Sequence, residues 1–352
     1  MPISDSENHL RTVRMTNPQW MPWSIGVWDC TWEYLGEELE KIVLRHPRTW
    51  PHYVKGSKDW RNIRYPEAGD TIDSWGCVWR TCENGKGIDG CVVEHPLADL
   101  SRLSTYVPPD PAKCNHMRPF DWEAHKRFMD REVAAGRFSG GSLDHGFHLL
   151  RLEYLLGFEN LMCHLADETP EFCRVVDMVH TFNKAFLTRM LDLGTQTIGL
   201  PEDLGTQTGS MVGPRFFRKW VLPYHKELHD LAHKYGAITG FHSDGNIMDV
   251  ADQILEIGPD IFNPQDRLNG VDNLAKAFKG RTCIALDFDR QHTLPFGTPH
   301  EVAELVEYEV KTLGSPRGGL LIQSEVRGPI PAENIDALAT ALEKYSTHWF
   351  DA

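Results

Sequence analysis

Short apolar segments recur along the chain, and most are followed by an amphipathic stretch. This pattern predicts seven strands, at 23–28, 137–143, 197–200, 237–242, 260–263, 283–287 and 318–324. Because these segments lack polar alternation, they are typical of parallel strands that helices cover on both faces. The stretches between them predict helices at 34–45, 121–135, 214–235, 246–257, 271–278, 299–313 and from Pro331 onward.

The alternation favours an α/β fold of the (β/α)8 TIM barrel type over an open doubly wound sheet. An open sheet usually carries a glycine-rich phosphate turn after its first strand, and the sequence has neither a GxGxxG nor a Walker motif. A closed barrel needs eight strands, so the pattern leaves one strand unassigned.

The first 110 residues differ in character from the rest of the chain. Residues 1–20 are polar and predict a loose N-terminal arm. TIDSWGCVWRT (71–81) and GIDGCVVE (87–94) flank the turn sequence ENGKG, which predicts a β-hairpin with Trp75, Cys77 and Trp79 on one face. PPDP (108–111) is a stiff connector. We therefore expect one structural domain, in which 1–110 form the arm, first barrel strand and hairpin, and 111–352 the remainder of the barrel.

In βα barrels the chemistry lies where strands end and helices begin. Carboxylates occupy these junctions, which are Asp144–His145, Glu202–Asp203, His242 to Asn246, Asn263 to Asp266, Asp287 to Asp289, and Ser324 to Arg327. If the strand ends meet at one mouth, several negative charges share a small volume. A divalent cation, a basic substrate or shared protons would compensate such repulsion.

His242 and Asp244 are the strongest pair of candidate functional residues. Residues two apart on a strand point to the same face, so both side chains can point into the mouth. There they could bind a metal or act as an acid/base couple. Alternatively, Asp244-Gly-Asn246 is a turn in which Asp244 or Asn246 caps the next helix.

Composition and charge narrow the class of partner. Thirty-six Lys and Arg against 50 Asp and Glu give a net charge of −14, without a long basic block, which argues against a nucleic-acid or membrane partner. The eight cysteines are scattered and include no CxxC pair, so we expect reduced thiols in a cytoplasmic protein. The N-terminal sequence lacks the apolar core of a signal peptide, and no apolar run approaches a membrane span.

Other candidate residues have a structural explanation beside the functional one. His225, His229 and His233 recur every four residues, a spacing that can bind metal, but we expect them to form a solvated or partly packed helix edge. The early tryptophans, including Trp75, could roof the barrel mouth and stack on a flat ring, or pack the arm and hairpin. We expect structural thiols at Cys77, Cys82 and Cys91.

The segment FHSDGNIMDVADQILEIGPDIFNPQ (241–265) resembles a characteristic motif of the uroporphyrinogen decarboxylase-like superfamily, whose members include corrinoid-dependent methyltransferases. The similarity extends to SWGCVW (74–79), EDLGTQ (202–207), 213–236 and IPAENIDALATALEKY (330–345). It covers most of the chain from about residue 24. The resemblance implies a barrel enzyme that transfers methyl groups, such as a demethylase of a small methylated or methoxylated compound that works with a corrinoid protein.

The sequence departs from the superfamily's zinc site. In the zinc-dependent methyltransferases a cysteine follows the histidine by two residues, and a second cysteine ends the last strand. Here the first position holds Asp244, and QSEVRG (323–328) contains no thiol. We therefore expect His242, Asp244 and Glu325 to be catalytic residues or ligands of a metal held by nitrogen and oxygen alone.

We expect five further residues to bind substrate. Arg327 could orient a substrate carboxylate or neutralise Glu325. The full set is Glu202, Asp203, Asp287, Arg327 and Trp75.

Two other functions stay open, a metal-dependent lyase or hydrolase without corrinoid, and a non-catalytic module that docks a corrinoid protein. Uroporphyrinogen itself is not an expected substrate. The arginine-bearing N-terminal segment of the true decarboxylases has no counterpart in residues 21–43, and an acidic mouth is a poor host for a polyanion.

Overall fold

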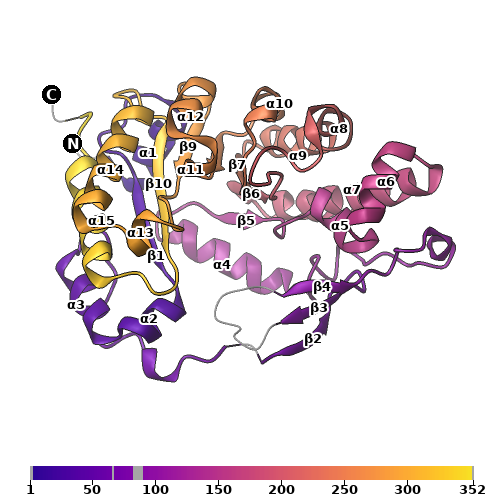
Figure 1. Cartoon of the computed structure of the whole chain (residues 1–352), viewed down its shortest axis with the longest axis horizontal. Coiled ribbons are helices and arrows are strands. Elements are labelled where there is room, and N and C mark those ends of the chain that lie inside the picture. Colours follow the sequence, from indigo (N-terminus) through magenta and orange to yellow (C-terminus); the bar gives the residue numbers. More distant parts are fainter. Residues whose placement is uncertain (1–2, 66, 82–89, 351–352) are drawn as a thin grey trace. The chain divides into compact units, whose positions relative to one another are not determined.

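The computed structural model describes residues 3–65, 67–81 and 90–350 (Figure 1). The contacts of these residues divide them into two units. One unit comprises the described residues up to Glu67 and those from Asn263 onward. The other comprises the described residues from Ala68 to Phe262. The boundary between them falls within strand β8 (Ile261–Pro264).

The unit that contains both ends of the described chain is built on parallel strands. Its strands follow one another in the order β1 (Trp23–Val27), β10 (Leu320–Val326), β9 (Cys283–Leu286) and the second half of β8. Its helices are α1 (Asp5–Arg14), α2 (Asp29–Leu35), α3 (Glu37–Arg45), η1 (Trp60–Asn62), α11 (Asp266–Asn269), α12 (Val271–Phe278), α13 (Thr293–Phe296), α14 (Pro299–Leu313) and α15 (Ala332–Tyr345).

The other unit holds the central part of the chain. The first half of β8 is followed in hydrogen-bonded order by β7 (Ile238–Ser243), β6 (Thr197–Pro201) and β5 (Gly140–Ser142). A separate antiparallel sheet contains β2 (Gly69–Ile72), β3 (Val78–Thr81) and β4 (Cys91–Glu94). The helices are η2 (Leu100–Ser104), α4 (Trp122–Ala134), α5 (Leu149–Leu156), α6 (Phe158–Asp167), α7 (Pro170–Asp192), α8 (Gly213–Trp220), α9 (Leu222–Lys234), η3 (Met248–Val250) and α10 (Ala251–Ile257).

All seven strands expected from the apolar segments are present. They form a seven-stranded sheet, and each of its four pairings with a defined register is parallel. Strand β9 is buried at every position, which explains its unbroken apolar run. The protein is therefore an α/β fold with a parallel sheet. An eighth strand is not part of this sheet in the described residues, so closure into a barrel stays a prediction.

The expectation of a loose N-terminal arm is wrong, because residues 5–14 form helix α1. The side chain of Ser4 accepts a hydrogen bond from the backbone N–H of Glu7, and Met15 ends the helix in a left-handed conformation. The fully buried Asn8 binds the backbone of Gln19 and Trp20 through its amide. A polar stretch can thus be ordered by caps and side-chain amides that leave little trace in the hydrophobic pattern.

The predicted hairpin is confirmed in part, since β3 and β4 pair antiparallel, while ENGKG lies outside the described residues. The first predicted strand, 71–81, is wrong as a single element. A turn separates β2 from β3, and in it the Asp73 carboxylate accepts the backbone N–H groups of Trp75 and Cys77. Gly76 adopts the positive φ of 84° in this turn.

The helix predicted at 214–235 is broken at Val221 into α8 and α9. Pro223 explains the break, because proline has no N–H to donate to the preceding turn. The buried face of α9 includes two of the three histidines, so the expectation for the histidine edge is wrong at two positions. His225 and His229 are fully buried, whereas His233 lies at the edge and pairs with Asp260.

Two further features concern the helices and the cysteines of the described residues. Among the helices of the described residues, none is both long and apolar enough to span a membrane. The seven described cysteines are free thiols, and Cys82 lies outside the described residues.

A buried ion pair connects the antiparallel sheet to helix α5. The Arg151 guanidinium donates to the Asp73 carboxylate, and both side chains are inaccessible to solvent. The same carboxylate also accepts the Trp79 indole N–H at 3.0 Å. One carboxylate thus balances a buried charge and shapes the turn between β2 and β3.

We predict that Asp73→Ala destabilises the protein by about 3–5 kcal/mol, because it leaves the Arg151 charge buried without a partner. Asp70→Ala is the matched control, since Asp70 forms an exposed pair with Arg80 whose loss should cost at most about 1 kcal/mol. Denaturant unfolding of the two variants measures both values. Equal losses would show that the buried pair has no special role.

Candidate functional site

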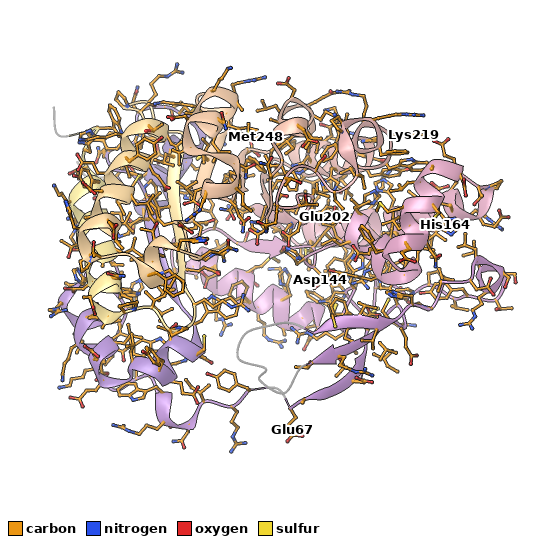
Figure 2. The ribbon with its side chains drawn as sticks, in the orientation of Figure 1. Glu67, Asp144, His164, Glu202, Lys219 and Met248 are labelled. Carbon is orange, nitrogen blue, oxygen red and sulfur yellow. The ribbon has the colours of Figure 1, made fainter. Side chains whose placement is uncertain are left out.

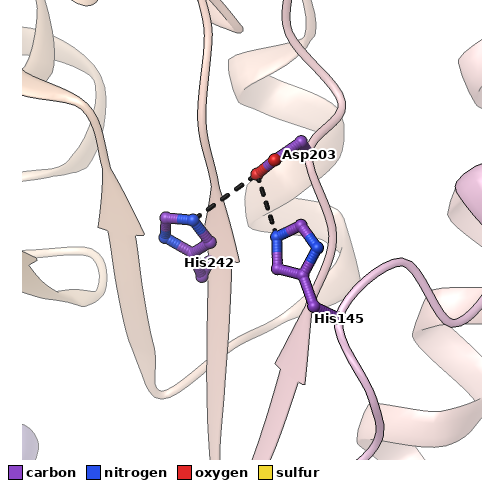
Figure 3. Close-up of side chains that lie close together, drawn as sticks. All are labelled: His145, Asp203 and His242. Atoms are coloured by element: carbon purple, nitrogen blue, oxygen red, sulfur yellow. Dashed lines mark ion pairs between the residues drawn. The ribbon is translucent and has the colours of Figure 1, made fainter. Parts of the chain in front are cut away.

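Three polar side chains meet at the carboxyl ends of β5, β6 and β7, in the central unit (Figure 3). His145 follows β5, Asp203 follows β6, and His242 lies near the end of β7. The Nε2 atoms of His145 and His242 lie 3.2 and 3.4 Å from the same Asp203 oxygen, Oδ1. We call these three residues the His–Asp–His cluster.

The cluster remains accessible to solvent while its charges interact strongly. The exposed side-chain fractions are 46% for His145, 33% for Asp203 and 29% for His242. Partial burial works to raise the pKa of Asp203, but hydrogen bonds from both imidazoles and from the backbone N–H of Asp244 outweigh it and hold that pKa well below its usual range. The hydrogen bond to Asp203 raises the pKa of His145. Asp203 therefore draws positive charge to this point.

Glu202, labelled in Figure 2, anchors the strand end from which Asp203 projects. It is fully buried, and one carboxylate oxygen accepts the backbone N–H groups of His148 and Leu150 at 3.0 and 2.9 Å. The other oxygen lies 2.6 Å from Nε2 of His225. Burial works against its charge, yet these hydrogen bonds lower the pKa of Glu202. It thus joins β6 to the start of α5 and to α9.

Two glycines hold together the loops that follow β6 and β7. A Cβ atom on Gly245 would lie 2.2 Å from the carbonyl carbon of Gly205, so only glycine permits this approach. Backbone hydrogen bonds run from Gly205 to Asp244 and from Asn246 to Thr206. The end of β6, which Asp203 follows, and the end of β7, where His242 lies, are therefore fixed relative to each other.

Asp244 lies beside the cluster, with Oδ1 3.7 Å from Nε2 of His242, so the expected proximity of these two residues is confirmed. Its backbone N–H donates to Oδ1 of Asp203 at 2.9 Å. The turn of the alternative interpretation is present as well, because Gly245 has a φ of +83° and the Asn246 side chain accepts the backbone N–H of Met248. The helix cap of that interpretation is wrong, since neither η3 nor α10 has a side-chain cap hydrogen bond.

The remaining expected catalytic residue, Glu325, belongs to the other unit, so its grouping with His242 stays a prediction. Within that unit Glu325 and Asp287 share the guanidinium of Arg290, at 3.3 and 2.8 Å. The Trp28 indole N–H also donates to Glu325. Burial raises the pKa of Asp287 to about 7 despite the nearby arginine.

The last two expected substrate-binding residues have different environments. Arg327 is half-buried, and its guanidinium stacks on Trp28 at 4.4 Å from the ring centroid. The ion pair of Glu325 is with Arg290. Trp75 is buried, stacks on His116 and donates its indole N–H to that ring. Its packing is clear, and its role in substrate binding stays a prediction.

Sequence reasoning assigned no role to His145 or to Arg290. His145 lies two residues after the predicted strand 137–143, and Arg290 lies three residues after Asp287. Their positions relative to the strand ends were therefore the available signal. What the sequence could not show is the distance between side chains from different strands.

The His–Asp–His cluster can hold a proton between an imidazole and the carboxylate, or place a positive charge against a bound molecule. It is also the one group of this kind found among the described residues whose ligand atoms all lie within 4.8 Å of one another. Each of these uses requires access from solvent, which the cluster has.

The fold and the position of the cluster define an α/β protein with its polar centre at the carboxyl ends of parallel strands. The chain belongs to the uroporphyrinogen decarboxylase (URO-D) family, whose model matches residues 84–345. Family membership confirms the resemblance seen in the sequence.

The chain is also similar to individual proteins. It is 27% identical over 133 residues to the methylcobamide:CoM methyltransferase MtbA of Methanosarcina acetivorans, and the match spans 37% of each chain. A solved methyltransferase from Methanosarcina mazei has a TM-score of 0.62 at 12% identity and covers 97% of this chain and 98% of its own. This second likeness shows a shared fold.

We predict that Gly245→Ala disrupts the site through its backbone. Gly258, with a φ of +85° and open space around it, is the matched control. Gly258→Ala should cost only the roughly 1–2 kcal/mol of a left-handed alanine. Gly245→Ala should cost about 1–3 kcal/mol more, because the added methyl overlaps Gly205. Thermal or denaturant unfolding measures the difference, and equal costs would contradict a close contact between the two loops.

Proposed function

We propose that the protein transfers a methyl group between a small methylated or methoxylated compound and a corrinoid carried by a partner protein, on a closed (β/α)8 barrel. The observation that carries this proposal is the solvent-accessible His–Asp–His cluster at the strand ends of a URO-D family chain. The similarity to a methylcobamide-dependent methyltransferase supports the choice of reaction.

Methyl transfer to the corrinoid breaks the bond between carbon and the heteroatom of the donor, whose electron pair stays on the heteroatom. A reduced corrinoid held by the partner protein would supply the electron pair that takes up the methyl group. Negative charge therefore develops on the heteroatom, and positive charge held at that position stabilises the transition state. In this proposal Asp203 orients the imidazoles of His145 and His242 and draws that positive charge to the cluster.

The other expected residues fall into two groups, residues that position the site and residues that contact substrate. Glu202 and Trp75 are buried and hydrogen-bonded within the protein, so we assign them to positioning the site. Asp244 holds Asp203 through its backbone N–H. Asp287, Glu325 and Arg327 stay proposed substrate contacts, supported by their positions at or just after the ends of β9 and β10.

The test is methylation of free cob(I)alamin by a panel of methoxylated aromatic compounds, followed by the absorbance of methylcobalamin. We expect wild-type protein to accelerate the transfer, and Asp203→Asn to lower its rate by about 10²-fold or more. Asp260→Asn is the matched control, because Asp260 pairs with His233 next to the start of β7, away from the cluster. Its rate should remain within about threefold of wild type.

Two results would overturn the proposal. One is an equal rate for wild type and Asp203→Asn. The other is no methylation above the protein-free rate with any donor. Turnover of a donor without any cobalamin would instead support the lyase or hydrolase alternative.

A further inference from the structure

We propose that His145, Asp203 and His242 together bind one divalent transition-metal ion, through two imidazole nitrogens and one carboxylate oxygen. This inference rests on the proposed function and deepens it, because the bound ion would be the source of the positive charge at the same site. It does not need that function for its test, because metal binding is measured without methyl donor or corrinoid.

The first support is the spacing of the ligand atoms. The Nε2 atoms of both histidines face Oδ1 of Asp203, at 3.2 and 3.4 Å (Figure 3). Ligand atoms about 2.1 Å from a tetrahedral ion lie about 3.4 Å from one another. The observed separations therefore already match those of ligands around a single ion. All three ligand atoms lie within 4.8 Å of one another, so small side-chain rotations complete the site.

The second support is the rigidity of the supporting backbone. Asp203 follows β6 and His242 lies near the end of β7, and Gly205 and Gly245 hold the loops after these two strands in backbone contact. The backbone N–H of Asp244 donates to the Asp203 carboxylate, as the outer hydrogen bonds of metal-binding carboxylates do. The side chains are 29–46% exposed, which leaves an entry path and free coordination positions.

The third support comes from a comparison with another His–Asp pair in the same unit. His233 and Asp260 lie 2.8 Å apart, and Thr239 completes their hydrogen bonds. That pair is a surface interaction with one histidine. In the cluster, two histidines share one carboxylate oxygen, an arrangement that provides three ligands from three different strand ends.

The ligand set determines the kind of ion. Imidazole and carboxylate suit zinc, iron(II), cobalt(II) and manganese, and no cysteine belongs to the group. Two neutral imidazoles and one carboxylate leave a divalent ion with one unit of positive charge, whereas one imidazole and two thiolates would leave none. The ion thus retains charge where the proposed transfer builds negative charge.

The experiment uses chelator-treated full-length protein and Zn²⁺ or Co²⁺ alone. We expect one ion per chain, and an X-ray absorption spectrum with nitrogen and oxygen neighbours at about 2.0–2.2 Å and no sulfur at about 2.3 Å. His145→Ala and Asp203→Asn should each weaken binding by more than about 100-fold, since loss of an outer hydrogen bond alone costs 10–100-fold. His233→Ala is the matched control and should bind as wild type does.

Three results would overturn the proposal. They are a sulfur neighbour, an affinity that the His145→Ala and Asp203→Asn changes leave unaltered, and an Asp244→Asn loss that exceeds the Asp203→Asn loss. The absorption spectrum of wild-type protein needs no variant, so it decides even if a variant fails to fold. Metal-loaded protein without methyl transfer would refute the proposed function alone. Full transfer activity in metal-free protein would refute the catalytic role of the ion.

Discussion

The parallel register of β5, β6 and β7 brings together residues that lie about 100 positions apart in the sequence. Ser142 at the end of β5 pairs with Gly199, two residues before the end of β6, and Pro201 at the end of β6 pairs with His242 near the end of β7. These strands therefore end within a few residues of one another. The residues that follow must then meet at one edge of the sheet. A slip of one residue in this register would turn His242 to the opposite face, and the His–Asp–His cluster would not form.

Buried polar groups stabilise this register through their contacts with the helices. Glu202 connects the end of β6 to α5 and α9, and it does so with both carboxylate oxygens. Asp73 and Arg151 join the antiparallel sheet to α5 in the same way. The Glu202 carboxylate is matched by several donors and the Asp73 carboxylate by an opposite charge, which is the condition under which burial of an ionised group is tolerable. Buried groups that do not contact solvent therefore support the solvent-accessible His–Asp–His cluster.

The strand ends were a good guide to the site, but a poor guide to the role of each residue. His242, Asp203 and Asp244 were expected at the site and lie together there, whereas His145 received no role. Glu202 looked equivalent to Asp203 in the sequence, because both follow the same strand. Successive residues point to opposite sides, so one carboxylate turns inward to α9 and the other toward solvent. Which of the two turns inward depends on helix packing, which the strand pattern does not contain.

The sequence by itself determined the seven strands, most of the helices between them and the superfamily, because apolar runs, caps and prolines act over a few residues. It did not reveal helix α1 or the break at Val221, where side-chain amides and one missing N–H override the hydrophobic pattern. Only the tertiary structure decided that Arg290 neutralises Glu325, that His225 is buried, and that His145 joins His242 on Asp203. Those outcomes depend on distances between side chains that are far apart in the chain, and the register and packing of several elements together set those distances.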